Sequence, residues 1–221
     1  MNNFILMGLT AISLFITIYL FYDDKQKNIE KYNKNRTVNE NLIKIYFIVI
    51  SISTLVIAYL LPINDFFYNF PYQIKVMVLL SIMAVVLVTD FYSFRIPNTF
   101  IIYGLVARVL ILAYEFIKTS DILGIVIKNE IIGALALLFC GILCNVVIKN
   151  SLGYGDIKLF ILMGLFLGLA NVWNAMIVSL IISFFVSVYV LLVKKMKKND
   201  IIPFAPSIAI GTFLTVLLMM R

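Results

Sequence analysis

The sequence predicts an all-α, polytopic membrane protein with about eight transmembrane helices and its N-terminus outside. Of the 221 residues, 63% are hydrophobic and 13% are charged, and the mean hydropathy is +1.06. This is too much apolar surface for one soluble core and too little polar surface to cover it. The apolar stretches also lack the alternation of apolar and polar residues that marks the strands of a membrane β-barrel.

Apolar runs long enough to cross a membrane recur along the whole chain. A helix needs roughly 20 mostly apolar residues to cross about 30 Å of hydrocarbon. Charged or turn-rich breaks divide the sequence into eight predicted spans, of which the sixth is short. They are residues 4–22, 43–61, 74–92, 99–116, 131–148, 157–171, 173–193 and 204–220. We expect the first to be a retained anchor, because no basic segment precedes it and no small-residue cleavage site follows it.

Lysine and arginine are concentrated in alternate loops. Cytoplasmic loops carry an excess of these residues, so the pattern predicts that the N-terminus lies outside. The net charge of +7 then reflects topology, and we expect no nucleic-acid binding, because the basic loops lack interleaved aromatic residues or a recognisable binding module. The predicted cytoplasmic loops are 22–42, 93–98, 149–156 and 194–203, and the predicted outer loops, 62–73, 117–130 and 171–173, contain only Lys118 and Lys128.

Two carboxylates lie where predicted spans meet the cytoplasm. Asp90 ends the third span in VLVTDFYSFRIPN, and Asp156 begins the sixth in GYGDIKL. Ionisable residues at the edge of a span usually face the bundle interior or a wet cavity, so both are candidate site residues. Each could equally cap a helix when considered alone. Gly153 and Gly155, however, permit close approaches that a simple cap does not require.

The absence of histidine restricts the chemistry. It excludes Ser-His and Cys-His nucleophiles and histidine metal sites. Two neighbouring carboxyl groups cannot both ionise, so one keeps a proton while the other acts as a base on a shared water, as in aspartic proteases. We expect no cofactor and no metal. Cys140 and Cys144 are expected to pack inside the bundle, because two cysteines alone make a poor zinc site.

Three segments, in this order along the chain, resemble those of one family. GYGDIKL resembles the GxGD signature of membrane-embedded aspartic proteases, and in particular of type IV prepilin peptidases, where a lysine follows two positions later as Lys158 does here. DFYSFRIPN is similar to that family's first catalytic segment, an Asp followed by a turn with a basic residue and proline. IIPFAPSIAIG, residues 201–211, resembles its late Pro-Phe-x-Pro turn. Three ordered motifs are far more specific than GxGD alone.

The resemblance implies an endopeptidase that removes the short, positively charged leader of type IV pilin-like precursors. It implies cleavage at the cytoplasmic face of the inner (plasma) membrane, after a glycine and before a hydrophobic helix. Asp90 and Asp156 would be the catalytic pair, and the partners would be a prepilin-like substrate with a short basic leader and the lipid bilayer. The substrate-binding part of the site would comprise Gly153, Gly155, Lys158, Arg95, Pro97 and Asn98.

The chain resembles the short, peptidase-type members of that family. Many longer bacterial members carry a cytoplasmic domain with two CxxC pairs after the first span and also methylate the new N-terminus. Here the corresponding loop has only about twenty residues and no cysteine, which argues against a second catalytic activity. We expect one integral membrane peptidase domain over 1–221, with two spans and a short cytoplasmic loop in 1–73 and the catalytic helical core in 74–221.

Several positions keep two interpretations. Arg95, Pro97 and Asn98 either hold the turn beside Asp90 or begin the fourth helix. Lys158 either pairs near the carboxylates or extends to the surface. Arg108, within the fourth span, is expected to tilt towards the outer interface and has no assigned catalytic role. The alternative function is an ion-coupled membrane transporter using intramembrane acids, which predicts acids near mid-membrane and related halves of the chain.

Overall fold

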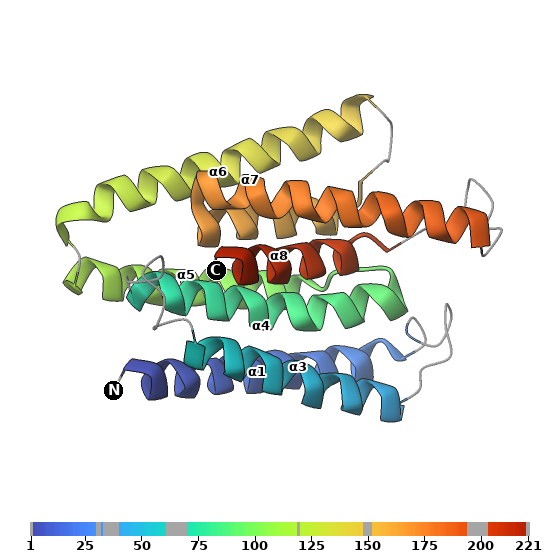
Figure 1. Cartoon of the computed structure of the whole chain (residues 1–221), viewed down its shortest axis with the longest axis horizontal. Coiled ribbons are helices and arrows are strands. Elements are labelled where there is room, and N and C mark those ends of the chain that lie inside the picture. The colour runs from blue at the N-terminus through green and yellow to red at the C-terminus, as the bar shows by residue number, and fades with distance from the viewer. Residues whose placement is uncertain are drawn as a thin grey trace.

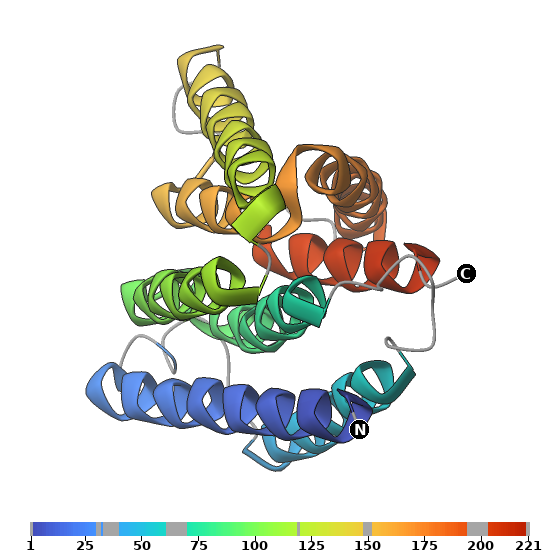
Figure 2. The same cartoon turned by 90° about the vertical axis from the view of Figure 1, so that its left-hand side faces the viewer.

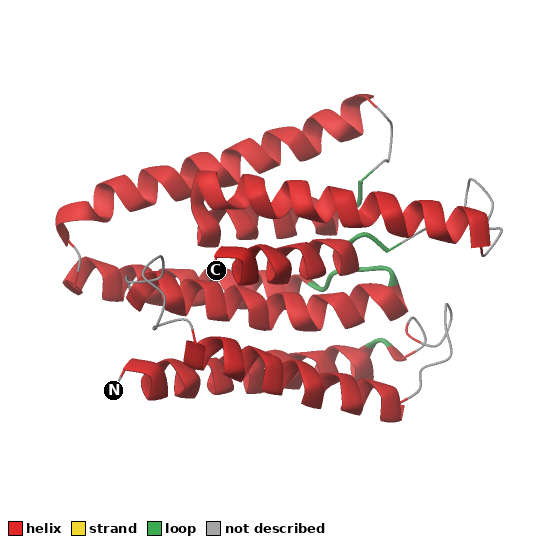
Figure 3. Cartoon of the chain, in the orientation of Figure 1, coloured by secondary structure: helices red, strands yellow, loops and turns green. Residues whose placement is uncertain are grey.

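The computed structural model describes residues 2–29, 32, 40–60, 70–118, 120–147, 152–193 and 203–219. Within these ranges the chain consists of helices and short loops (Figure 3). The helices are α1 (Asn2–Lys27), α3 (Glu40–Leu60), α4 (Phe70–Ser93), α5 (Asn98–Lys118), α6 (Ser120–Val147), α7 (Tyr154–Val193) and α8 (Ala205–Met219). Six of them are long and apolar enough to cross a membrane, and α8 is a shorter apolar helix. The prediction of an all-α polytopic membrane protein is confirmed.

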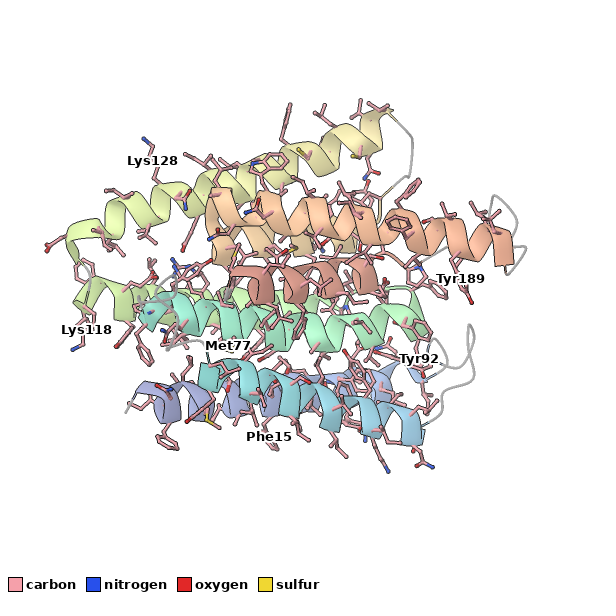
Figure 4. The ribbon with its side chains drawn as sticks, in the orientation of Figure 1. Phe15, Met77, Tyr92, Lys118, Lys128 and Tyr189 are labelled. Carbon is pink, nitrogen blue, oxygen red and sulfur yellow. The ribbon has the colours of Figure 1, made fainter. Side chains whose placement is uncertain are left out.

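Helix α4 lies at the centre of the bundle. Most of its side chains are buried, and it packs against α1, α3, α5, α7 and α8. Figure 2 shows α1 and α3 on one side of the pair formed by α4 and α5, and α6, α7 and α8 on the other. The bundle has two ends (Figure 1), which we call the Asp90 end and the Lys118 end. Tyr92 and Tyr189 lie at the Asp90 end in Figure 4.

Helix α7 is interrupted at Gly168, where φ is 72° and ψ is 173°. These angles are essentially restricted to glycine, and a Cβ there would collide with the Asn129 side chain. The Asn129 side-chain oxygen accepts a hydrogen bond from the Leu169 N–H at 3.3 Å, which satisfies a backbone donor at the break. The chain reverses direction here (Figure 1), so the sixth and seventh predicted spans are the two arms of α7. An unbroken helix of 40 residues would be about 60 Å long, twice the hydrocarbon thickness.

Small residues bring α6 close to the first arm of α7. A Cβ on Gly164 would collide with the Ala134 backbone, and one on Gly133 would lie 2.9 Å from the Gly168 carbonyl carbon. Such residues let membrane helices approach closely and gain van der Waals contact. The second arm of α7 packs against α8 in the same way, where Gly211 meets Ser179. Both arms are thereby held against their neighbours.

Four buried charges join α4, α5 and α6. Lys75 Nζ lies 2.8 Å from Glu115 and 2.6 Å from Glu130. Arg108 lies 2.9 Å from Glu115 and also pairs with Glu130. All four side chains are at most 8% exposed. Each charge has two partners of opposite sign, which is how charges inside a membrane protein are usually accommodated. We call these four residues the buried quartet.

The buried quartet corrects two predictions. Arg108 does not tilt towards the outer interface but is buried against the two glutamates. The predicted loop 117–130 is helical from Ser120 onwards, so α6 starts well before the predicted span. Within this helix Glu130 is buried by its ion pairs, while Lys128 is exposed and projects away from the bundle (Figure 4).

Eight basic residues used to predict the orientation lie outside the described residues. They are Lys31, Lys34, Arg36, Lys149, Lys194, Lys195, Lys197 and Lys198. Among those that the structure does describe, Lys25 and Lys27 occupy the last turn of α1, and Arg95 follows α4, all at the Asp90 end. Lys118 lies at the other end (Figure 4). These four residues lie at the ends to which the loop pattern assigns them, and the orientation of the protein in the membrane stays a prediction.

Candidate active site

Asp90 lies near the end of α4 and is held by the start of α8. It is 6% exposed, and its Oδ2 accepts a hydrogen bond from the backbone N–H of Ala205 at 3.0 Å. Ala205 is the first residue of α8, which begins within the Pro-Phe-x-Pro turn. The first N–H groups of a helix have no partner inside the helix. The positive end of α8 therefore faces the Asp90 carboxylate and favours negative charge there.

Asp156 lies in the first turn of α7, at the same end of the bundle. Its carboxylate accepts a hydrogen bond from the Gly153 backbone N–H. The Gly153 carbonyl in turn accepts the first helical bond, from the Ile157 N–H at 3.2 Å. An acidic residue at the third helical position that bonds back in this way forms half of a capping box. Asp156 therefore does cap α7. Its charge also interacts with that of Asp90, which a residue that served only as a cap would not require.

The fold thus brings the two carboxylates together from separate helices. Asp90 is buried, whereas Asp156 is half-buried and is the more accessible of the two to water. Two like charges close together repel each other. Here each receives a backbone N–H at a helix N-terminus, and the two helix dipoles offset part of that repulsion. Such a pair can perform acid and base steps on a single water molecule.

Gly153 and Gly155 allow close contacts within the protein. A Cβ on Gly153 would lie 3.0 Å from Oδ2 of Asp156, and one on Gly155 would lie 3.1 Å from the Cβ of Ile96. Gly153 therefore leaves room for the carboxylate, and Gly155 lets α7 pack against the turn that follows α4. Among the described glycines only Gly168 has a positive φ. Close approach, and not unusual backbone angles, is thus the reason for glycine at these two positions.

The turn after α4 is strained beside Asp90. The Phe94 N–H donates to the Asp90 carbonyl at 3.0 Å, and Phe94 has a φ of 51°. A residue in this left-handed conformation commonly ends a helix, but the position is usually occupied by glycine. For a residue with a side chain the conformation costs roughly 1–2 kcal/mol. The backbone of Asp90 is therefore fixed by a turn that other contacts must hold in place.

The remaining predicted site residues lie in the turn after α4, at the start of α5 and in the second turn of α7. Arg95 Nη2 donates to both carboxylate oxygens of Asp24, at 2.8 and 2.9 Å. Pro97 is buried immediately before α5, and Asn98 is the first residue of that helix. Lys158 is exposed, and its Nζ donates to the Asn98 side-chain oxygen at 2.9 Å. Arg95 thus holds the turn after α4, and Asn98 begins α5. Lys158 bonds to the side-chain amide of Asn98.

Sequence reasoning missed Asp24. The polar stretch after the first span was expected to be a loop, whereas α1 continues to Lys27. Asp24 is 8% exposed and accepts a hydrogen bond from the Tyr32 hydroxyl at 3.0 Å, in addition to those from Arg95. Burial and the adjacent Asp24 charge raise the pKa of the Tyr32 phenol, which therefore stays a donor. Nothing local distinguishes Asp24 from its neighbour Asp23, so only tertiary structure could have revealed it.

The fold and the site define a class: a helical polytopic membrane protein with two interacting aspartates at one end of its bundle. A comparison with known families gives the particular assignment. Residues 77–192, which include both aspartates, match the type IV leader peptidase family. The chain belongs to that family, so the predicted family is confirmed; the first two of the three sequence segments lie within the matched residues, and the third, 201–211, lies beyond them.

One similar protein is the prepilin leader peptidase/N-methyltransferase of Bacillus subtilis (strain 168). It is 29% identical to this chain over 143 residues. The aligned region covers 63% of this chain and 54% of the relative, so the chain spans about half the length of that relative. No solved structure is significantly similar to this protein.

Proposed function

We propose that this protein is a membrane-embedded aspartic endopeptidase that removes the leader of type IV pilin-like precursors at the cytoplasmic face of the plasma membrane. The observation that carries the proposal is the placement of two carboxylates at one end of the bundle, Asp90 at the end of α4 against the start of α8 and Asp156 in the first turn of α7. Family membership supports peptidase chemistry, and two carboxylates in a chain without histidine support the aspartic type. The catalytic core is proposed to be 74–221, with 1–73 supplying two further spans.

In the proposed reaction, a water held between Asp90 and Asp156 is the nucleophile. The ionised carboxylate takes a proton from the water as the new C–O bond forms, and the protonated partner gives its proton to the carbonyl oxygen. The resulting gem-diol returns one proton to the pair, and the pair protonates the leaving amine as the C–N bond breaks. The pair then holds one proton again, which belongs to both groups because coupled carboxyls titrate together.

The substrate-binding edge of the site is proposed to lie between the turn after α4 and the start of α7. These two segments are joined by the packing of Gly155 on Ile96 and by the hydrogen bond between Lys158 and Asn98. Arg95, Pro97 and Gly153 are proposed to shape the same edge. A peptide bond inside a regular helix is tied into the backbone ladder. The cut must therefore fall in extended chain, between a short polar leader and an apolar helix.

The direct test is processing of a prepilin-like precursor by membranes that contain this protein, followed by mass measurement of the product. We expect one cut, after the glycine that precedes the hydrophobic helix. Replacing that glycine by valine is expected to abolish cleavage, because a β-branched residue keeps the backbone away from the carboxylates. Removing a few leader residues should matter far less. Cleavage of the valine precursor at the original rate would contradict close backbone approach, and an uncut glycine precursor would contradict the activity.

The proposed orientation can be tested with introduced cysteines in a chain carrying Cys140→Ala and Cys144→Ala. Lys27 and Lys118 are exposed and lie at opposite ends of the bundle. From the alternate-loop bias, we expect Lys27→Cys to react with an impermeant thiol reagent only from the cytoplasm. Lys118→Cys should react only from outside. Labelling of Lys27→Cys from outside would invert the orientation and place both aspartates on the wrong side for a cytoplasmic leader.

Ion-coupled transport is the alternative from another functional class. It predicts acids within the membrane, and Glu115 and Glu130 are buried in predicted spanning helices. Both are paired with Lys75 and Arg108, and such fixed pairs hold helices together instead of binding and releasing ions. The carboxylate pair at the Asp90 end therefore makes the peptidase the preferred proposal.

A further inference from the structure

The last turn of α1 is connected to the candidate active site through Asp24. This carboxylate accepts hydrogen bonds from three side chains: Arg95 at 2.8 and 2.9 Å, Tyr32 at 3.0 Å and Asn28 at 3.2 Å. Asn28 and Tyr32 follow Asp24 in the chain, whereas Arg95 belongs to the turn after α4. The side chains of Asp24 and Arg95 are 10% and 31% exposed. This ion pair is therefore more enclosed than the surface pairs that contribute little.

Both sequence neighbours of Arg95, Phe94 and Ile96, contact a segment that carries one of the two carboxylates. Phe94, immediately before it, ends α4 by donating to the Asp90 carbonyl. Ile96, immediately after it, is the surface on which Gly155 packs, one residue before Asp156. A shift of Arg95 would therefore move both contacts, and with them the spacing of the two carboxylates. Asp24 is the residue that fixes the position of the Arg95 guanidinium.

Tyr32 supports Asp24 from the other side. Its ring is fully buried and packs edge-on against Phe21, with 5.9 Å between centroids. Its hydroxyl donates to Asp24 and also interacts with the Ser93 hydroxyl at the end of α4. Asp24 is thus held by Asn28 and Tyr32 on one side and by Arg95, in the turn after α4, on the other. These contacts leave the carboxylate little freedom to follow Arg95 if the turn moves.

We propose that Asp24 is a positioning residue for the Asp90 and Asp156 pair, acting through Arg95 and the turn that Arg95 anchors. Asp24 does not touch the substrate in this scheme. It sets the distance between the end of α4 and the start of α7, so that both carboxylates reach one water. Its effect on turnover rests on the proposed peptidase function, whereas its effect on the packing of the turn does not.

The preceding residue, Asp23, provides a matched control. It lies on the same turn of α1 and forms an ion pair with Lys27 on the exposed side of the helix, at 2.7 Å. Asp23→Asn and Asp24→Asn remove the same charge from adjacent positions at the same end of the bundle. A general effect of charge on insertion or on binding of a basic leader would change both variants alike. A positioning effect would change only Asp24→Asn.

The kinetic test measures cleavage of a prepilin-like precursor. Asp24→Asn and Arg95→Gln are each expected to lower kcat by about 10- to 100-fold, because small misplacements of reacting groups have effects of that size. For Asp24→Asn, KM should change little, since Asp24 does not touch the substrate. Arg95→Lys should retain more activity than Arg95→Gln, because one nitrogen makes both contacts with Asp24. The double variant should be no slower than the slower single variant, since both act through one contact.

A second test reports the packing without requiring peptidase activity. In a chain carrying Cys140→Ala and Cys144→Ala, Ile96→Cys and Gly155→Cys would place two Cβ atoms about 3.1 Å apart, a few tenths of an ångström from disulfide range. Oxidation should cross-link this pair efficiently with Asp23→Asn and poorly with Asp24→Asn. Equal cross-linking in both, or an unchanged kcat in Asp24→Asn, would overturn the positioning role. Selective loss of cross-linking in a protein that cuts no precursor would overturn the peptidase proposal alone.

Discussion

Replacing either Asp90 or Asp156 by asparagine is expected to slow precursor cleavage by about 10²- to 10⁴-fold, while the protein still inserts and folds. A carboxamide can neither share the proton of the pair nor act as a base. Its oxygen can still accept the N–H of Ala205 or of Gly153, so the starts of α8 and α7 remain satisfied. The measurement is single-turnover cleavage of a purified precursor, with thermal unfolding in detergent to check folding.

Asp121 supplies a matched control for this prediction. It lies in the first turn of α6, at the Lys118 end, as Asp156 lies in the first turn of α7. Asp121→Asn removes the same charge from the first turn of another helix and should leave cleavage unchanged. The double variant of Asp90 and Asp156 should be no slower than the slower single variant, because the two act as a unit. Cleavage at the original rate by either single variant would remove that residue from the mechanism.

Replacing Glu130 by alanine is expected to lower the free energy of unfolding by about 3–5 kcal/mol, the usual cost of breaking a buried ion pair. The substitution leaves Lys75 and Arg108 facing Glu115 alone, so one positive charge inside the bundle is no longer compensated. The free energy of unfolding falls because one positive charge stays buried without a partner, and not because the attraction within the ion pair is itself strongly stabilising. Thermal or denaturant unfolding of the protein in detergent measures it.

Two further variants separate charge balance from packing in the buried quartet. Lys128 is exposed on the same helix as Glu130, and Lys128→Ala should not change stability. Combining Glu130→Gln with Lys75→Met leaves the Arg108 and Glu115 pair in place and should cost less than Glu130→Gln alone, because the remaining charges balance. If Glu130→Ala unfolded like Lys128→Ala, the quartet would not stabilise the bundle.

Most of the helices could be predicted because lipid leaves an apolar chain few alternatives to the helix. The predicted helix boundaries were wrong in two places, where charges are buried and where a glycine interrupts a helix. Glu130 interrupts an apolar run, and its partners Lys75 and Arg108 belong to other helices, so the start of α6 could not be recognised locally. The chain reverses at Gly168, between two equally apolar segments, and the predicted boundary therefore lay a few residues later.

Sequence motifs predicted the side chains of the candidate site, but not the backbone donors or the contacts between helices that hold them. Asp90 and Asp156 were proposed from sequence, and the structure places both at the same end of the bundle, near enough for their charges to interact; their catalytic role stays a prediction. The donor to Asp90 is the backbone N–H of Ala205, and no pattern of side chains in the sequence indicates a backbone donor. Asp24 depends on the packing of α1 against the end of α4, and the ion pairs of the buried quartet join three helices that are distant in sequence, so neither could be recognised from a local pattern.

The first arm of α7, residues 154–167, and α8 are short helices. With 14 and 15 residues they rise only about 21 and 22 Å, less than the roughly 30 Å of hydrocarbon in a bilayer. A lipid-facing helix of that length would have to thin the membrane around it. Most side chains of these two helices face protein instead, so their neighbours set the depth at which they begin. Asp156 and the α8 amide that holds Asp90 should therefore keep the same relative height in thin and thick bilayers, and acyl-chain length should act on the outer helices alone.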